Sequence, residues 1–151
     1  MPRRLIVRLK LFFSVAALIL PCAAFALDAS AGVKVTPLMK TSSSWDGKQI
    51  VYPAGQGEVT GLIVEIAPGG ETGWHEHPVP SFAYILDGEL EVTRSDGEVK
   101  LLKPGDTLAE VVNTLHNGRT LGAKPVKILV FYAGSKGGRL TIPHPEFLPK
   151  P

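Results

Sequence analysis

Residues 69–88 read GGETGWHEHPVPSFAYILDG, and this stretch decides how the rest of the sequence is interpreted. It places His75 and His77 two residues apart, between glycine and proline turn signals and ahead of a β-rich run. Side chains at positions i and i+2 of an extended strand point to the same face, roughly 6 to 7 Å apart along the backbone. Both imidazoles can therefore reach one cation.

A third histidine, His116, lies on a later β-like run, residues 115–120. A curled sheet would bring it to His75 and His77. Neutral imidazole is a common ligand of transition metals, and three of them leave coordination positions open for water or substrate. The sequence therefore predicts a metal site made of these three histidines.

Strand and turn signals follow one another along the chain, and no interval between them is long enough for a crossover helix. Asp87-Gly88 is typical of a two-residue hairpin turn, which would join and pair the strands on either side of it. We predict an all-β sandwich or barrel. The expected strands are residues 33–36, 49–52, 58–67, 73–77, 82–86, 89–94, 99–102, 107–112, 115–120, 126–133 and 140–142.

The N-terminus has the pattern of a signal peptide. Four basic residues precede an apolar run, and Ala24-Phe25-Ala26 offers the small residues that a signal peptidase needs. We expect cleavage after Ala26 and a periplasmic or secreted protein. The alternative is an uncleaved anchor, but the uncharged segment 11–27 has only the minimum length for spanning a membrane and is interrupted by Pro21.

Removal of residues 1–26 changes the charge of the chain. This segment holds four of the 16 basic residues and none of the 14 acidic ones, so about 125 residues with a formal charge of −2 remain. No basic cluster is left to indicate nucleic acid or a membrane as a partner. The single cysteine, Cys22, is removed as well, which excludes a disulfide and thiolate chemistry in the mature chain.

The spacing of these residues resembles that of the cupin superfamily. Gly70, His75, His77, position 81 and Gly88 follow the first cupin motif, and Gly105 with His116 eleven positions later follows the outline of the second. The resemblance covers residues 58–133. It implies a small jelly-roll barrel, also called a double-stranded β-helix, with a metal held inside by residues of both motifs.

The sequence departs from the cupin pattern at the usual glutamate ligand, where it has Ser81. Val111, Asn113 and Thr120 also replace the proline, glycine and asparagine usual in the second motif. The resemblance therefore supports a three-histidine site rather than a four-ligand one. Such a site leaves the full charge of a divalent ion in place, which favours Lewis acidity and anionic ligands.

Two acids lie near the histidines in the sequence. Glu76 should point away from the site, because it alternates with His75 and His77. Glu110 precedes the turn before His116 and is the candidate for a fourth ligand, a partner of a ligand or a catalytic acid or base; otherwise it is a surface or edge acid.

These features leave two functions open, besides a structural cupin whose site is empty. The first is an exported metalloenzyme that holds iron, manganese, nickel, copper or zinc and acts on a small molecule, with dioxygenase-like chemistry if the metal is iron. The second is a non-catalytic cupin that binds or senses a small ligand.

The organisation that we expect is a signal peptide at 1–26, a lead-in with the first strands at 27–57, the barrel at 58–133 and a C-terminal tail at 134–151. Phe82, Tyr84 and Leu86 share one face of their strand, opposite Ser81. Because this face is apolar, another part of the barrel or a second subunit should cover it, and of the two we expect a homodimer.

Overall fold

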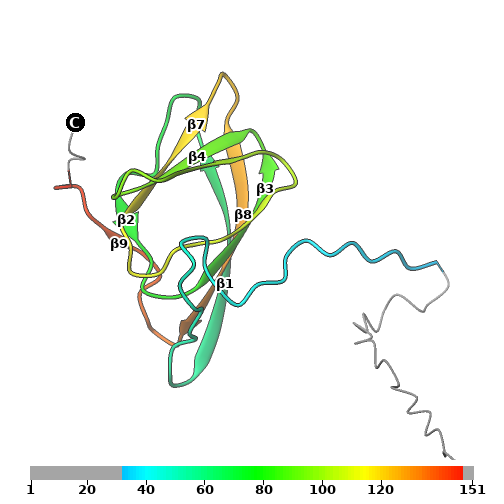
Figure 1. Cartoon of the computed structure of the whole chain (residues 1–151), viewed down its shortest axis with the longest axis vertical. Helices are drawn as coiled ribbons and strands as arrows, with labels where there is room; N and C mark the ends of the chain where they lie inside the picture. Colours follow the sequence, from blue (N-terminus) through cyan, green and yellow to red (C-terminus); the bar gives the residue numbers. More distant parts are fainter. Residues whose placement is uncertain (1–31, 148–151) are drawn as a thin grey trace, which may run out of the picture. The chain divides into compact units, whose positions relative to one another are not determined.

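The computed structural model of the chain describes residues 32–147 (Figure 1). The expected signal peptide lies outside these residues. Residues 32–36 have no regular structure, and residues 37–147 form an all-β unit. The described part of the chain contains no helix that is long and apolar enough to cross a membrane.

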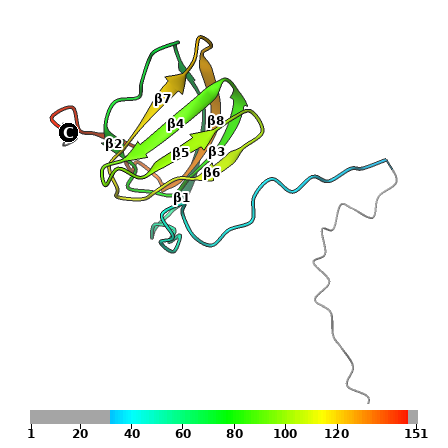
Figure 2. The ribbon, with the colours of Figure 1, turned by 45° about the horizontal axis from the view of Figure 1, so that its top comes forward.

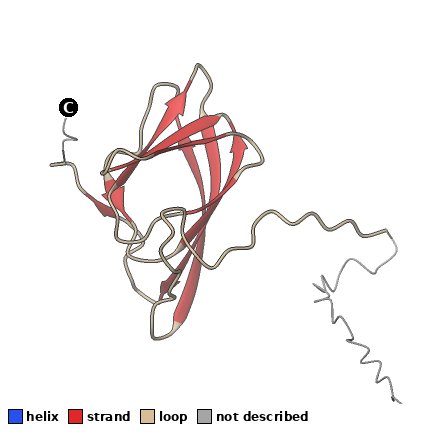
Figure 3. Cartoon of the chain, in the orientation of Figure 1, coloured by secondary structure: helices blue, strands red, loops and turns tan. Residues whose placement is uncertain are grey.

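Within residues 32–147, nine antiparallel strands form two sheets, and Figure 3 shows them wrapped around a common interior. One sheet has the order β1-β8-β3-β6 and the other the order β5-β4-β7-β2-β9. This arrangement is a jelly roll, as predicted. The strands are β1 (Gly57–Ile66), β2 (His75–Glu76), β3 (Ser81–Asp87), β4 (Glu89–Arg94), β5 (Val99–Leu102), β6 (Thr107–Ala109), β7 (His116–Leu121), β8 (Val126–Ser135) and β9 (Ile142–Pro143).

The core lies between the two sheets. Along β8, Val126, Ile128, Val130 and Tyr132 are buried, whereas the residues between them face outward. This alternation is the period of two that a half-buried strand requires. Leu90, Val92 and Leu102 complete the core from the five-stranded sheet. Burial of each large aliphatic side chain contributes about 1.5–3 kcal/mol, so the barrel has a core of its own without a metal.

The predicted hairpin at Asp87-Gly88 is wrong. The chain does turn there, but β3 pairs with β8 and β6 whereas β4 pairs with β5 and β7. Figure 2 shows β4 beside β5, and β3 in the other sheet. Gly88 has φ +76°, and a Cβ there would overlap the carbonyl oxygen of Pro125. The glycine thus allows the chain to cross from one sheet to the other where the backbone is too crowded for a side chain.

Two of the predicted strands are absent. Residues 33–36 are irregular, and residues 49–52 contribute only an isolated bridge between Gln49 and Ser43. Ser44 donates a hydrogen bond to Asp46, and Asp46 in turn accepts one from the backbone of Lys48. Such short polar side chains compete with a strand ladder and stabilise a turn instead.

The C-terminal tail is more than a surface segment. The last long strand continues to Ser135, and the short strand expected at 140–142 lies at Ile142–Pro143. It pairs with β2, the strand that carries His75. The tail therefore closes the edge of the five-stranded sheet next to the histidines.

Candidate metal centre

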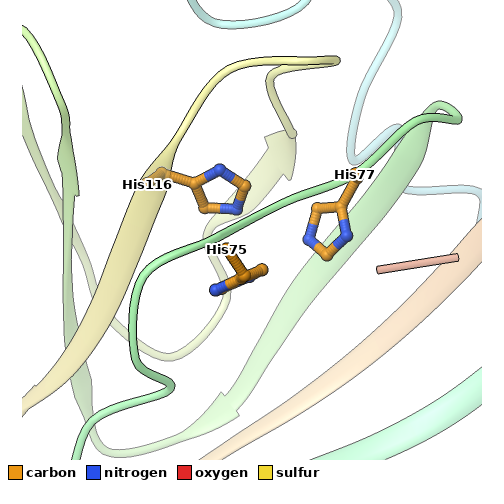
Figure 4. A group of neighbouring side chains, drawn as sticks. All are labelled: His75, His77 and His116. Atoms are coloured by element: carbon orange, nitrogen blue, oxygen red, sulfur yellow. The ribbon is translucent and has the colours of Figure 1, made fainter. Parts of the chain in front are cut away.

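The structure brings His75, His77 and His116 together, as Figure 4 shows. His75 lies in β2 directly opposite His116 in β7. His77 follows β2 by one residue, and its carbonyl accepts a hydrogen bond from the backbone of Asn113. All three rings point into the space between the sheets. His75 and His77 share a face because they are two residues apart, and His116 shares it because it is paired with His75 on the adjacent strand.

The spacing of the rings suits a single ion. One nitrogen from each histidine lies within 4.8 Å of one nitrogen of the others, and the ring centroids are 4.3 to 5.0 Å apart. His77 and His116 are buried, with 5% and 2% of their surface exposed. Bonds of about 2.0–2.1 Å to one ion hold two nitrogens at most about 4.2 Å apart, so the rings are at, or within a small shift of, the spacing that one ion requires.

Backbone carbonyls define the protonation of all three rings. Nδ1 of His75 lies 2.7 Å from the carbonyl oxygen of Gly73, Nδ1 of His77 lies 2.9 Å from that of Leu140, and Nδ1 of His116 lies 2.8 Å from that of Thr114. A carbonyl only accepts, so each Nδ1 carries the proton and each Nε2 keeps its lone pair. This is the arrangement that orients metal-binding histidines in proteins.

The free nitrogens fit a metal ion. Nε2 of His116 is buried and has no hydrogen-bond partner among the described residues. An unpaired buried acceptor costs free energy, so its retention indicates that this atom binds something in the interior. Three converging imidazole nitrogens suit iron, manganese, nickel, copper or zinc.

His75 and His77 are neutral over the physiological range of pH. Burial, and secondly the charge of a protonated His116, lower the pKa of His75 to about 4. The same two causes, followed by the charge of a protonated His75, lower the pKa of His77 to about 3. Neutral imidazole is the form that binds a metal, so neither of these two rings has to lose a proton before binding one at pH 7.

The three histidines line a cavity of about 80 Å³ inside the barrel. The rest of its wall is mostly aliphatic, and its polar side chains besides the histidines are Thr72, Ser81, Glu110 and Tyr132. Tyr132 packs edge-on against His77, with ring centroids 5.2 Å apart, and burial raises the pKa of its phenol. The sequence analysis missed this tyrosine, although its parity with Val130 on β8 would have placed it inside.

Glu110 faces the same cavity but lies outside the group of nitrogens that converge. Its Oε1 accepts hydrogen bonds from the indole N–H of Trp45, at 2.9 Å, and from the backbone N–H of Val111, at 3.2 Å. Trp45 belongs to the segment before β1. Glu110 is thus an oriented acid within the cavity rather than a member of the histidine cluster.

The other candidate acid, Glu76, points away from the cavity, as predicted. Its carboxylate lies 3.4 Å from Nε2 of His144, on the far side of β2. His144 also donates its backbone N–H to the carbonyl of Trp74, and the Trp74 ring packs against Phe147 with centroids 4.7 Å apart. Residues 140–147, which we call the C-terminal strap, are therefore attached to the histidine strand along their length.

The strap supplies the partner of His77, and the sequence analysis missed this. Both the Leu140 carbonyl and the Thr141 hydroxyl, at 3.2 Å, contact Nδ1 of His77. A main-chain carbonyl in a segment rich in glycine and proline leaves no signal in a sequence. Its role becomes visible only when the pairing of β9 with β2 is known.

Comparison with known proteins places most of this unit in one family. Residues 62–132 match the family model described as Cupin domain. Phomopsin biosynthesis cluster proteins C' and D of Diaporthe leptostromiformis are each 33% identical over 78 residues, which cover 44% of this chain. The match covers 41% of each relative, so this chain spans about two fifths of their length.

Solved structures show the same fold. The DMSP lyase DddQ from Ruegeria pomeroyi DSS-3 is 25% identical with a TM-score of 0.53, covering 60% of this chain and 45% of that one. A cupin-like protein from Thermotoga maritima is 19% identical with a TM-score of 0.52, covering 57% of this chain and 64% of that one.

Proposed function

Because residues 62–132 form a cupin domain, we propose that this protein holds a divalent transition metal through His75, His77 and His116 and is a metalloenzyme that acts on a small molecule. The observation that carries the proposal is the set of three Nδ1–carbonyl hydrogen bonds. They leave three Nε2 lone pairs directed at one point. A histidine cluster that served only to fill the core would not need its rings oriented in this way.

A divalent ion in this site supplies Lewis acidity and, if the ion is redox-active, electron transfer. The residues of the chain supply the surroundings. The aliphatic wall excludes bulk water, which strengthens the electrostatic interactions of a bound small molecule. Glu110, held by Trp45, is the candidate to accept or return a proton. With iron we propose dioxygenase-like oxidation, and with zinc hydration or hydrolysis.

The DMSP lyase neighbour supports an enzymatic role on a small molecule, because it shares this fold and its name is that of an enzyme. It does not identify the reaction, since the match covers less than half of that chain. The size of the cavity, about 80 Å³, suits a ligand of only a few heavy atoms inside the barrel.

The alternative is a non-catalytic binding or sensing protein, and one observation favours it. Glu110 is the only carboxylate that lines the cavity within residues 32–147, and two hydrogen bonds already engage one of its oxygens. If Glu110 serves only to brace the cavity wall through these two bonds, the site binds a ligand without transforming it.

We also propose that the protein is exported, with residues 1–26 as a cleaved signal peptide and the periplasm or the exterior as its location. The supports are the basic residues ahead of an apolar run and the Ala24-Phe25-Ala26 sequence. The N-terminal sequence of protein recovered from the periplasmic fraction tests this. A chain that starts before residue 27 or stays with the cells contradicts it.

Metal analysis of untagged protein tests the main proposal. We expect about one metal ion per chain in the wild type and almost none in His75→Ala, which should stay folded because the core does not depend on the site. A wild type that binds none of Fe(II), Mn(II), Ni(II), Cu(II) and Zn(II) after reconstitution would refute it. Turnover of small substrates under oxygen would then separate the enzyme from the binding protein, since only the enzyme yields product.

A further inference from the structure

Ser81 is the clearest difference between this cavity and the usual cupin pattern, which has a glutamate ligand at this position. It opens β3, where its backbone carbonyl accepts the N–H of Glu110, and its side chain lines the cavity together with the histidines. Only 2% of its surface is exposed, and its hydroxyl has no hydrogen-bond partner among residues 32–147. A buried hydroxyl without a partner is unfavourable, so a polar group of a ligand is its natural complement.

The charge of the site leads to the same ligand. Three neutral imidazoles leave both positive charges of a divalent ion uncompensated, and burial of an uncompensated charge in an aliphatic cavity is costly. Glu110 lies outside the histidine cluster and is held by Trp45. The compensating negative charge therefore has to come with the ligand.

The walls limit the rest of the ligand. Beyond the polar end, the cavity is lined by aliphatic side chains such as Val64, Ala83, Leu108 and Val130. A hydrated inorganic ion has nothing to bind there, whereas a short hydrocarbon body does. A cavity volume of about 80 Å³ keeps the buried part of the ligand small.

We propose that the cavity binds a small carboxylate with a short apolar body, whose carboxylate supplies the negative charge that the three histidines lack and accepts a hydrogen bond from the Ser81 hydroxyl. Serine at this position thus makes room for a charged group of the ligand. This inference rests on the proposed function, because it requires a metal in the site.

Cobalt(II) is a suitable probe, since its visible spectrum reports a change of ligand. Full-length protein loaded with Co(II) is titrated with acetate, propionate and butyrate, and with acetamide and chloride for comparison. We expect the carboxylates to change the spectrum at concentrations at least ten-fold lower than acetamide or chloride, and propionate or butyrate to bind more tightly than acetate.

Two substitutions at the same position give opposite results. Ser81→Ala removes the donor and should weaken carboxylate binding by about ten-fold or more, with metal affinity unchanged. Ser81→Glu brings a carboxylate of its own, so it should bind the metal about ten-fold more tightly or better and no longer respond to added carboxylate. Ser44→Ala is the control for loss of a buried hydroxyl, because Ser44 does not line the cavity.

The outcomes separate the two proposals. If the wild type binds Co(II) but responds to acetamide and carboxylates alike, or if Ser81→Ala binds carboxylates as well as the wild type, the carboxylate site is refuted and the metal site stands. If the wild type binds no metal, both are refuted. Circular dichroism of the metal-free variants shows whether each is folded, and Ser81→Ala decides the question should Ser81→Glu not fold.

Discussion

The orientation of His77 depends on a segment that follows the barrel strands, and a shortened chain tests this. Ending the chain after Arg139 removes both groups that contact Nδ1 of His77, namely the carbonyl of Leu140 at 2.9 Å and the hydroxyl of Thr141 at 3.2 Å. It also removes β9, which pairs with the strand of His75. The ring of His77 would then be free to rotate and to exchange its tautomer.

Two estimates agree on the size of the effect. Loss of a partner that orients a metal-binding histidine typically weakens metal affinity by about 10- to 100-fold, which corresponds to roughly 1.4–2.8 kcal/mol. Two lost hydrogen bonds at about 0.5–1.5 kcal/mol each give a similar sum. We therefore expect the dissociation constant for Zn(II) or Co(II) to rise by about 10- to 100-fold, measured in competition with a chromophoric chelator.

Leu140→Ala is the control that separates hydrogen bonding from packing. The Leu140 side chain packs against the core, and its removal should lower the melting temperature. The backbone carbonyl remains, so metal affinity should stay within about two-fold of the wild type. A second control, a chain ending after Phe147, retains every contact of the strap described above and should behave like the full chain.

Two results would refute this reasoning. The first is a folded chain ending at Arg139 that binds metal as tightly as the full chain. The second is a Leu140→Ala variant that loses as much affinity as the shortened chain, since packing rather than the carbonyl would then explain the loss. Circular dichroism of the metal-free proteins shows whether the barrel itself is retained.

Further predictions concern pH, the sheet crossing and the oligomeric state. Between pH 6.5 and about 4, His75 and His77 are protonated in the unfolded chain but neutral in the metal-free folded protein. The free energy of unfolding therefore falls as pH falls, by up to ~1.4 kcal/mol per pH unit for each histidine. Urea unfolding at several pH values measures this, and a variant with glutamine at both positions that keeps the same slope would contradict it. Gly88→Ala should destabilise the fold by at least about 2 kcal/mol more than Gly97→Ala. Both glycines have positive φ, but only at position 88 would the added Cβ overlap neighbouring backbone. Equal urea midpoints for the two variants would show that the crowding is unimportant. We propose a homodimer through the outer face of β1, β8 and β3. The Ile63 side chain on this face is 53% exposed, so Ile63→Glu should convert the dimer to a monomer, as measured by light scattering. A monomeric wild type would refute the proposal.

The strands that sequence periodicity predicted best are those with a clear inside and outside. The bounds expected for β4 and β5 are those observed, and β1 and β8 differ only at their ends. Alternation is a local property, because each residue either reaches the core or does not. Pairing is not local. The Asp87-Gly88 turn was identified correctly, but the chain on either side of it enters different sheets, and no short-range signal distinguishes such a crossing from a hairpin.

The positions of the histidines followed from spacing, and their chemistry did not. Parity placed His75 and His77 on one face even though β2 has only two residues, and His116 lies directly opposite His75. Their Nε2 atoms are available because main-chain carbonyls bind the Nδ1 protons. Every residue has a main-chain carbonyl, so no residue type in the sequence indicates which ones do this. Similarly, parity left the direction of Glu110 open, because a turn separates it from β7.

The contacts that orient the cavity come partly from outside the region that matches the family model. Residues 62–132 contain all three histidines, yet the partner of His77 lies at Leu140 and the partner of Glu110 lies at Trp45. These two segments approach the site from opposite ends of the chain and contact two different groups within it. A change in either segment could alter metal affinity or proton transfer without touching a histidine. Differences in reaction between proteins that share this barrel can thus arise in the flanking segments, where a family model has no positions to compare.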